Sequence, residues 1–388
     1  MKNILIVITN FRHGGTNKSL QNFLSLQNSN NDYQFDIFAM EHFGPYKEML
    51  PNCIIIPKNK WINSIIGHWK DIKNEEKTLS LILKILFKIS ILISTDSINF
   101  LYKKVVNKLA KNKKYDAVIA YSEGVPTAFV SQLQHENKIA WIHSDYKSYL
   151  ELNNYPDETK IYETFKSIVC VSEFTKKEFC NSIKIKKNKV YSIHNTINSE
   201  QIKRQSLSNI DDKLFIKYEF NLISVGRIDI VKRFDLIPEI VFSLKKRGLN
   251  FKWYLIGPSG FGNAQIKFEQ NFKKYDIDDY FIWLGEKDNP YPYIAKSDLL
   301  VITSKSEACP YVLNEAKILG IPVLATNFGS VTEFIINEEN GYVTTVETIV
   351  DKIEHIINNK EEYIRIKENI SHFVYDNDEI LKKIYEIL

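Results

Sequence analysis

The chain has 388 residues, of which 44% are hydrophobic and 25% charged, and its formal net charge is +4. This length is too great for one ordinary hydrophobic core and predicts two globular domains. The four cysteines show no CxxC spacing, which argues against a zinc site or a disulfide framework and is typical of a reducing compartment.

The first half of the chain alternates strand-like and helix-like segments. Its first apolar run begins at residue 4 and has no cleavage site after it, so we expect no signal peptide. A helix-like pattern follows over 19–27, and further apolar runs recur downstream. Such continuous runs are typical of buried parallel strands, and their alternation with helices predicts a doubly wound sheet. The strand-like segments are 2–9, 35–40, 53–57, 115–122, 138–144 and 167–172.

Residues 58–114 are strongly basic, with 13 lysines against four acidic residues. Within them, LSLILKILFKISILIS carries Lys84 and Lys88 four positions apart on an otherwise apolar stretch. A helix here either packs in the core with its lysines in water or lies on an anionic membrane surface. No apolar stretch reaches 18 residues, so nothing is expected to span a membrane.

The polar segment 198–214 lacks a clear period and is the best candidate for a domain boundary. We place a first domain at 1–200, a second at 201–370, and a C-terminal helix at 371–388 that packs back on the first domain. The strand and helix rhythm restarts after the boundary. The fold class expected is therefore α/β, with two Rossmann-like domains facing a cleft, where ligands bind beyond the carboxyl ends of the strands. In the second half, the strand-like segments are 220–227, 251–260, 280–286, 298–304 and 321–330, and the helix-like segments are 234–248, 266–275 and 311–320.

The segment VGRIDIVKRFD places Gly226 where a strand ends, followed by Arg227 and Lys232. A glycine allows close approach of the backbone to a ligand, and two cations beside a helix N-terminus can grip a diphosphate. Read alone, the same pattern also describes an ordinary surface turn.

The segment SEACPYVLNEA places Glu307 before Pro310 and Glu315 after it. Proline suits the first turn of a helix, and the backbone N–H groups from Ala308 to Tyr311 would then face the ligand. Carboxylates repel phosphate, but they accept hydrogen bonds from sugar or ribose hydroxyls. The alternative for Glu315 is an exposed helix glutamate near Lys317.

Other polar positions follow strand-like segments. The loop HGGTNK offers Gly14 and Gly15 to a ligand, although it can equally be a plain turn, and no GxGxxG fingerprint supports a nicotinamide dinucleotide site. His143 is either catalytic or a hydrogen-bonded structural histidine, and Asn195 alone is typical of a turn. The DxD spacing at 276–278 falls in a polar turn, which we interpret as a solvated loop.

These motifs, in their order along the chain, resemble family 4 glycosyltransferases. The resemblance covers almost the whole chain and rests on the GG loop, the strand end at His143, VSEF, HNTIN, VGRIDIVKR, GEKDNPYPYI and the E-x7-E pattern EACPYVLNE. It is similar in particular to bacterial enzymes that build capsule or lipopolysaccharide. The resemblance implies the GT-B fold and a retaining enzyme that uses a nucleotide sugar.

The resemblance assigns roles residue by residue. Arg227 and Lys232 would hold the donor diphosphate, Glu315 the ribose hydroxyls, and Glu307 the donor sugar at the reacting face. His143 would stand at the reacting centre of the acceptor-binding first domain. The further donor-binding positions are Gly15, Gly226, Gly285, Ala308, Cys309, Pro310, Tyr311 and Val312, and the further acceptor-binding positions are Gly14, Gly15 and Lys18.

Two departures from the family pattern concern specificity. Ala308 and Cys309 stand where glycine and a large apolar residue are common, which bears on the donor sugar. Asn17 stands where an acidic residue is frequent, which bears on the acceptor.

The resemblance implies metal-independent transfer of a hexose, from a UDP-sugar to a lipid-linked glycan, in which the leaving diphosphate takes the acceptor's proton. We expect no cofactor, no metal and no nucleic-acid partner. Residues 58–114 would dock the enzyme on the inner face of the cytoplasmic membrane. A sugar-nucleotide epimerase or a non-catalytic membrane-associated scaffold are the alternatives.

Overall fold

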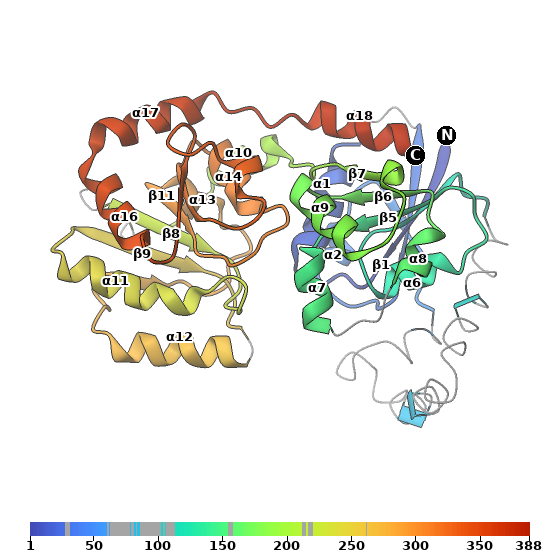
Figure 1. Cartoon of the computed structure of the whole chain (residues 1–388), viewed down its shortest axis with the longest axis horizontal. Helices are drawn as coiled ribbons and strands as arrows, with labels where there is room; N and C mark the ends of the chain where they lie inside the picture. Colours follow the sequence, from blue (N-terminus) through green and yellow to red (C-terminus); the bar gives the residue numbers. More distant parts are fainter. Residues whose placement is uncertain are drawn as a thin grey trace. The chain divides into compact units, whose positions relative to one another are not determined.

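The computed structural model describes residues 1–27, 32–59, 113–153, 158–211, 220–260 and 262–388, with ten isolated residues between these ranges. They form two compact units (Figure 1). Unit 1 comprises Met1–Thr196 with Asn377–Leu388, and unit 2 comprises Ile197–Asp376. The predicted α/β class with two parallel sheets is confirmed.

Unit 1 is built on a seven-stranded parallel sheet in the order β3-β2-β1-β4-β5-β6-β7. Strands β4, β5 and β6 are buried from end to end and β1 from Ile4 onward, because side chains of both faces lie under helices. The strands are β1 (Lys2–Ile8), β2 (Tyr33–Ala39), β3 (Cys53–Ile55), β4 (Ala117–Ala120), β5 (Lys138–Ile142), β6 (Ser167–Cys170) and β7 (Val190–Ser192). The helices are α1 (Gly15–Ser25), α2 (Tyr46–Met49), α6 (Val125–Ser131), α7 (Tyr146–Asn153), α8 (Thr159–Glu163), α9 (Glu173–Ser182) and α18 (Asn377–Ile387).

The C-terminal helix α18 belongs to unit 1, although it lies far from the rest of that unit in the sequence (Figure 1). Tyr385 stacks on Tyr33 with ring centroids 5.0 Å apart, and its hydroxyl donates to Gln27 Oε1 at 2.8 Å. The Leu388 carbonyl accepts from Asn137 Nδ2 at 3.2 Å. These contacts fix α18 against the amino-terminal edge of the sheet.

Unit 2 has a six-stranded parallel sheet in the order β10-β9-β8-β11-β12-β13. One face carries α11, α12 and α16, and the other carries α10, α13 and α14 (Figure 1). The strands are β8 (Phe220–Val225), β9 (Phe251–Ile256), β10 (Phe281–Trp283), β11 (Leu299–Ile302), β12 (Val323–Thr326) and β13 (Tyr342–Thr344). The helices are α10 (Ser199–Ser206), α11 (Ile237–Lys246), α12 (Asn263–Lys274), α13 (Tyr291–Ala295), α14 (Tyr311–Ile318), α15 (Val331–Phe334), α16 (Ile349–Asn358) and α17 (Lys360–Ser371).

Two apolar layers sandwich this second sheet. Trp253 points into the layer under α11 and α16, and its neighbour Tyr254 points into the layer under α13 and α14. Successive side chains of a strand face opposite sides of a sheet, so a strand buried on both sides must be apolar throughout. This requirement explains the continuous apolar runs of the sequence.

The strand order reverses direction once in each sheet. In unit 2 the reversal lies between β8 and β11, and in unit 1 between β1 and β4. The loops that leave the carboxyl ends of two such strands diverge to opposite sides and leave a crevice for a ligand. The loops after β8 and β11 contain the two charged motifs found in the sequence.

The domain boundary differs in detail from the sequence expectation. The chain passes into unit 2 after Thr196, and the polar segment that begins at residue 198 opens with helix α10. Asn198 caps this helix by accepting from the Gln201 amide at 3.0 Å, and only Ile202 of the helix is buried. A helix with so narrow an apolar face shows little periodicity in sequence.

The basic segment 58–114, with its expected helix, lies almost wholly outside the described residues. In the part of the chain that the structure describes, no helix has the length and apolar character needed to cross a membrane.

Candidate active site

Three glycines bring the loops after β8, β9 and β10 into contact. Gly226 has φ 155°, and a Cβ on Gly257 would lie 1.8 Å from the Gly226 carbonyl oxygen. The Gly257 amide donates to the Gly285 carbonyl at 2.9 Å. Any larger residue at position 257 would force the loops apart, so glycine is required where these backbones cross.

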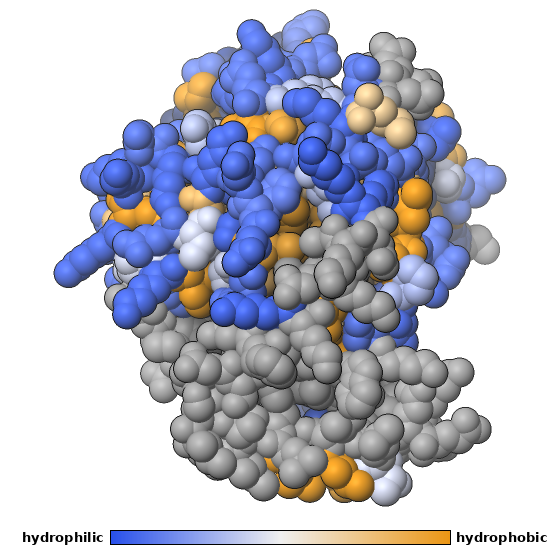
Figure 2. Space-filling model, turned by 90° about the vertical axis from the view of Figure 1, so that its right-hand side faces the viewer, coloured by the Kyte–Doolittle hydropathy of each residue, from blue (hydrophilic) through white to orange (hydrophobic). Residues whose placement is uncertain are grey.

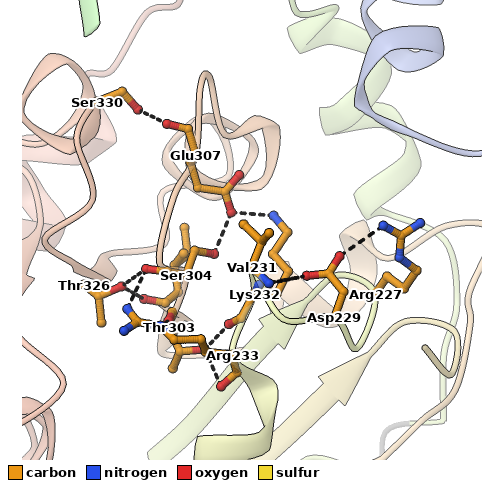
Figure 3. Close-up of polar contacts among 11 residues, drawn as sticks. Arg227, Asp229, Val231, Lys232, Arg233, Thr303, Ser304, Glu307, Thr326 and Ser330 are labelled. Carbon is orange, nitrogen blue, oxygen red and sulfur yellow. Dashed lines mark hydrogen bonds and ion pairs between the residues drawn. The ribbon is translucent and has the colours of Figure 1, made fainter. Parts of the chain in front are cut away.

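Asp229 organises the two predicted diphosphate ligands (Figure 3). Its Oδ1 accepts from the amides of Val231 at 3.0 Å and Lys232 at 2.8 Å. Its Oδ2 accepts from Arg227 Nη2 at 3.1 Å. The Arg227 side chain remains 57% exposed and can therefore reach a ligand in solvent. Sequence reasoning missed Asp229. An Asp side chain that accepts from backbone amides two and three residues later is nevertheless typical of a turn.

Lys232 and Glu307 meet across the two loops (Figure 3). Lys232 Nζ lies 2.5 Å from Glu307 Oε1, and the same oxygen accepts from Ser304 Oγ at 2.6 Å. Ser330 Oγ donates to the Glu307 backbone carbonyl at 2.8 Å. The ion pair is largely shielded, with side-chain exposures of 25% and 13%. Each charge therefore neutralises the other in a half-buried position.

Glu315 is a buried residue of α14, with 2% exposure. Its Oε1 accepts from the Tyr291 hydroxyl of α13 at 3.2 Å. Lys317 is also buried and donates to the Phe334 carbonyl at 2.9 Å, and burial lowers its pKa to about 8. The alternative of an exposed helix glutamate near Lys317 is therefore wrong.

Helix α14 begins beside the Glu307 loop. Pro310 is its N-cap, one position before the first turn, with φ −72°. Ala308 is 8% exposed, while Cys309, Tyr311 and Val312 are partly buried against the apolar layer beneath. The positive end of the helix dipole thus lies at the same sheet edge as Lys232 and Arg227, where it favours an anion.

In unit 1, the GG loop opens helix α1. Gly14 is the N-cap and Gly15 the first helical residue, and a Cβ on either would meet no atom within 4 Å. Lys18 follows on the first turn of the helix. Asn17 Nδ2 donates to the carbonyls of Asn10 at 3.0 Å and Arg12 at 2.7 Å. A carboxylate cannot donate these bonds, which explains the amide at this position.

His143 lies directly after β5. Its amide and that of Ser144 both donate to Glu123 Oε1 at 2.7 Å, and its ring lies 4.9 Å from the Tyr121 ring. Its Nε2 is buried and has no hydrogen-bond partner among the described residues. The residue as a whole is partly exposed, but the ionising ring is desolvated, and this burial lowers the pKa of His143 to about 3. The imidazole is therefore neutral.

Beneath His143 lies a buried polar network that sequence reasoning missed. Ser19 Oγ donates to Asn195 Oδ1 at 2.8 Å and lies 2.8 Å from the Tyr121 hydroxyl. Asn195 is 5% exposed, so it is a buried structural residue rather than only a turn former. The network links α1, the end of β4 and the loop after β7.

The remaining candidates lie elsewhere. Asp276 accepts from Lys245 Nζ at 2.9 Å in an exposed turn, and among the described residues no three His, Cys, Asp or Glu side chains gather as metal ligands. A depression of about 440 Å³ after β13 is lined by residues such as Thr344, Thr348 and His355. It contains none of the predicted site residues.

The unit that carries the charged loops matches a known protein family. The family model described as glycosyl transferases group 1 matches residues 207–373, nearly all of unit 2. An uncharacterized protein of the cps region of Klebsiella pneumoniae is 24% identical over 67% of this chain and 76% of its own length. The amylovoran biosynthesis glycosyltransferase AmsD of Erwinia amylovora is 24% identical over 72% of this chain and 80% of its own. The chain spans about half the length of other curated relatives that it matches.

Solved structures agree in fold. The crystal structure of Anabaena HepE in complex with UDP and glucose is similar with a TM-score of 0.74, at 15% identity, covering 100% of this chain and 99% of that protein. The two parallel-sheet domains are therefore those of the GT-B fold. Over residues 207–373, unit 2 is similar to the glycosyl transferases of group 1.

Proposed function

We propose that this glycosyltransferase moves a hexose from a UDP-sugar to a lipid-linked glycan, with retention of configuration and without a metal ion. The observation that carries the proposal is the 2.5 Å contact of Lys232 with Glu307 at the carboxyl ends of β8 and β11. It places a cation suited to phosphate next to a carboxylate suited to sugar hydroxyls, at the position where such sheets bind ligands.

The donor would occupy the charged loops of unit 2. Arg227 and Lys232 would bind the diphosphate, assisted by the amino-terminal end of α14. Glu307 would accept from hydroxyls of the sugar, and Glu315 from those of the ribose. Because Glu315 is buried and held by Tyr291, we expect that a side-chain movement accompanies nucleotide binding.

The reaction needs no protein nucleophile. The acceptor oxygen attacks the anomeric carbon as the bond from that carbon to the diphosphate breaks, and the acceptor's proton passes to a diphosphate oxygen on the same face. Negative charge grows on the departing diphosphate, and Arg227 and Lys232 stabilise it from fixed positions. Asp229 holds the Arg227 guanidinium and the Lys232 backbone amide before the donor arrives, and the Lys232 ammonium would pass from Glu307 to the diphosphate when the donor binds.

The biosynthetic role rests on the relatives. Named ones include the amylovoran glycosyltransferase of Erwinia amylovora and the capsular polysaccharide biosynthesis glycosyltransferase CapM of Staphylococcus aureus. These names support transfer to a growing surface polysaccharide over the epimerase and scaffold alternatives. On the acceptor side we propose Gly14, Gly15, Lys18 and the neutral imidazole of His143.

We also propose that the basic segment 58–114 docks on the anionic inner leaflet. Among its few described residues, Leu81, Ile82 and Ile85 are 46%, 50% and 48% exposed, and apolar side chains reach the surface at the lower edge of Figure 2. Exposed apolar groups beside Lys84 suit an interface with acidic lipid.

The division of labour between Lys232 and Glu307 can be tested with UDP, which has a diphosphate but no sugar. We expect Lys232→Ala to weaken UDP binding roughly 30-fold in calorimetry, as a charge-assisted contact of about 2 kcal/mol predicts. Glu307→Ala should bind UDP as well as the wild type or better, because it frees Lys232. The rate at which this variant releases UDP from the sugar nucleotide should nevertheless fall at least about 100-fold.

Lys305→Ala is the matched control, since it removes an exposed lysine side chain from the same loop. The backbone amide of residue 305, which donates to Val231, is kept in this variant. This variant should leave the UDP affinity and the rate of UDP release unchanged. Equal loss of UDP affinity in the Glu307 and Lys232 variants would contradict the assignment.

The depressed pKa of His143 predicts a pH effect on stability. Between about pH 3 and 6.5 the unfolded chain binds a proton at this ring that the folded chain does not bind. The stability that the neutral ring contributes is thus complete above pH 6.5 and is lost as the pH falls. His143→Gln should therefore lose less stability than the wild type between pH 7 and pH 5, by up to about 2 kcal/mol.

The measurement is urea denaturation at both pH values, together with histidine NMR. The His143 signal of the wild type is identified by its absence from the His143→Gln spectrum. Its chemical shift should stay constant from pH 5 to pH 8. A midpoint near pH 6.5 for that signal would show that the ring is solvated.

Membrane docking can be tested by sedimentation with vesicles. The chain should bind vesicles with 30% phosphatidylglycerol and not pure phosphatidylcholine, and binding should weaken with salt. Replacing Leu81, Ile82 and Ile85 together by serine should weaken binding at least about 10-fold, since apolar contact is lost. Val374→Ser, at a residue of unit 2 that is 82% exposed, should have no effect. Equal binding to both kinds of vesicle would contradict the proposal.

A further inference from the structure

Arg233 has a strained backbone at the edge of the candidate site. Its φ is 52° and ψ 37°, the left-handed region, between Lys232 and the short 3-10 turn Phe234–Leu236. Glycine adopts this conformation freely, whereas a residue with a Cβ does so at a cost. Such strain persists only where other contacts compensate for it, and it concentrates at functional sites.

The guanidinium of Arg233 holds the loop after β11 (Figure 3). Its Nε donates to the Thr303 carbonyl at 2.9 Å, and its Nη2 donates to the Ser304 carbonyl at 2.8 Å. The planar fork thus spans two consecutive peptide groups, which a lysine ammonium cannot match. Bonds from a charged donor are about twice as strong as neutral ones.

Two neutral contacts run between the same loops. Thr303 Oγ1 donates to the Lys232 carbonyl at 2.7 Å, and the Lys305 amide donates to the Val231 carbonyl at 2.7 Å. The two residues before Arg233 are therefore tied to the residues on either side of Ser304. The two loops form one clasp, in which Arg233 supplies the charged bonds.

The clasp leads directly to the charged pair. Ser304, whose carbonyl Arg233 holds, donates through its hydroxyl to Glu307 Oε1 at 2.6 Å. That oxygen is also the one that contacts Lys232 Nζ. Movement of Ser304 would therefore displace the Glu307 carboxylate relative to the ammonium.

The charge of Arg233 is engaged within the protein. Asp235 and Glu347 lie close enough to act on it electrostatically, and its side-chain hydrogen bonds go to the backbone carbonyls of Thr303 and Ser304. This separates it from Arg227, whose guanidinium is mainly exposed.

We propose that Arg233 is a positioning residue, which sets Glu307 against Lys232 by clamping the Thr303 and Ser304 carbonyls and so places the donor sugar. The inference rests on the proposed function of that pair. It requires that Arg233 influence the chemical step more than nucleotide affinity, because Lys232 and Arg227 sit on their own loop under the control of Asp229.

The decisive variant is Arg233→Gly, because glycine suits the left-handed backbone and removes only the side chain. We expect it to fold, to bind UDP within threefold of the wild type, and to release UDP from UDP-glucose at least tenfold more slowly. Added guanidinium ion at tens of millimolar should restore part of the rate. Arg233→Lys should remain slow, since an ammonium does not span both carbonyls.

Arg247→Ala is the control, because Arg247 also lies in unit 2 and pairs with two carboxylates, Asp351 and Glu354, away from the site. It should keep the wild-type rate and show no response to guanidinium. Full activity of Arg233→Gly, or a lost rate that follows thermal stability and is not rescued, would overturn the proposal.

Hydrogen exchange provides a readout that does not depend on activity. The Lys305 amide is bonded across the clasp, so the peptide that contains it should exchange at least tenfold faster in Arg233→Gly and not in Arg247→Ala. If the wild type released UDP from no sugar nucleotide, the proposed function would fail, while faster exchange would still support the clasp. Unchanged exchange would overturn it in either case.

Discussion

The ion pair between Lys232 and Glu307 is the interaction on which the candidate site depends. It joins the loops that leave β8 and β11, the two strands between which the sheet order reverses. Two half-buried charges are tolerated because each neutralises the other and Ser304 satisfies the shared oxygen. A donor that brings its own negative diphosphate and its own hydroxyls offers both groups a new partner. In the proposed function the pair therefore opens when the donor binds.

The residues around the ion pair hold its loops in place. Asp229 fixes the amide of Lys232 and the guanidinium of Arg227, and the glycines at 226 and 257 let neighbouring loops pack directly on the backbone. Fixed cations do not have to reorganise as charge develops on the leaving diphosphate, which is how an enzyme gains rate from electrostatics. In unit 1, Glu123 and the Tyr121 ring hold His143 in the same preorganised manner.

Sequence alone predicted the strands and the two parallel sheets, because strands buried on both faces must be continuously apolar. It also singled out Arg227, Lys232 and Glu307 by residue type and by position after strands. It did not indicate that Lys232 and Glu307 pair, because they lie 75 residues apart and their contact depends on strand order. Asp229 was overlooked because it acts through backbone amides, which leave no periodic pattern.

Glu315 shows the opposite difficulty. Its helix has a weakly amphipathic pattern, so an exposed position stood as the alternative to ribose binding, whereas the residue is buried against Tyr291. The strain at Arg233 is likewise invisible in sequence, because any residue type can stand before a turn and only the backbone angle reveals the cost.

The most direct test of the account is a crystal structure of the chain with UDP-glucose. Lys232 Nζ should leave Glu307 and lie about 3 Å from a phosphate oxygen, with the Glu307 carboxylate within hydrogen-bond distance of a glucose hydroxyl. A structure in which the nucleotide sugar binds elsewhere while the Lys232–Glu307 pair stays closed would contradict it.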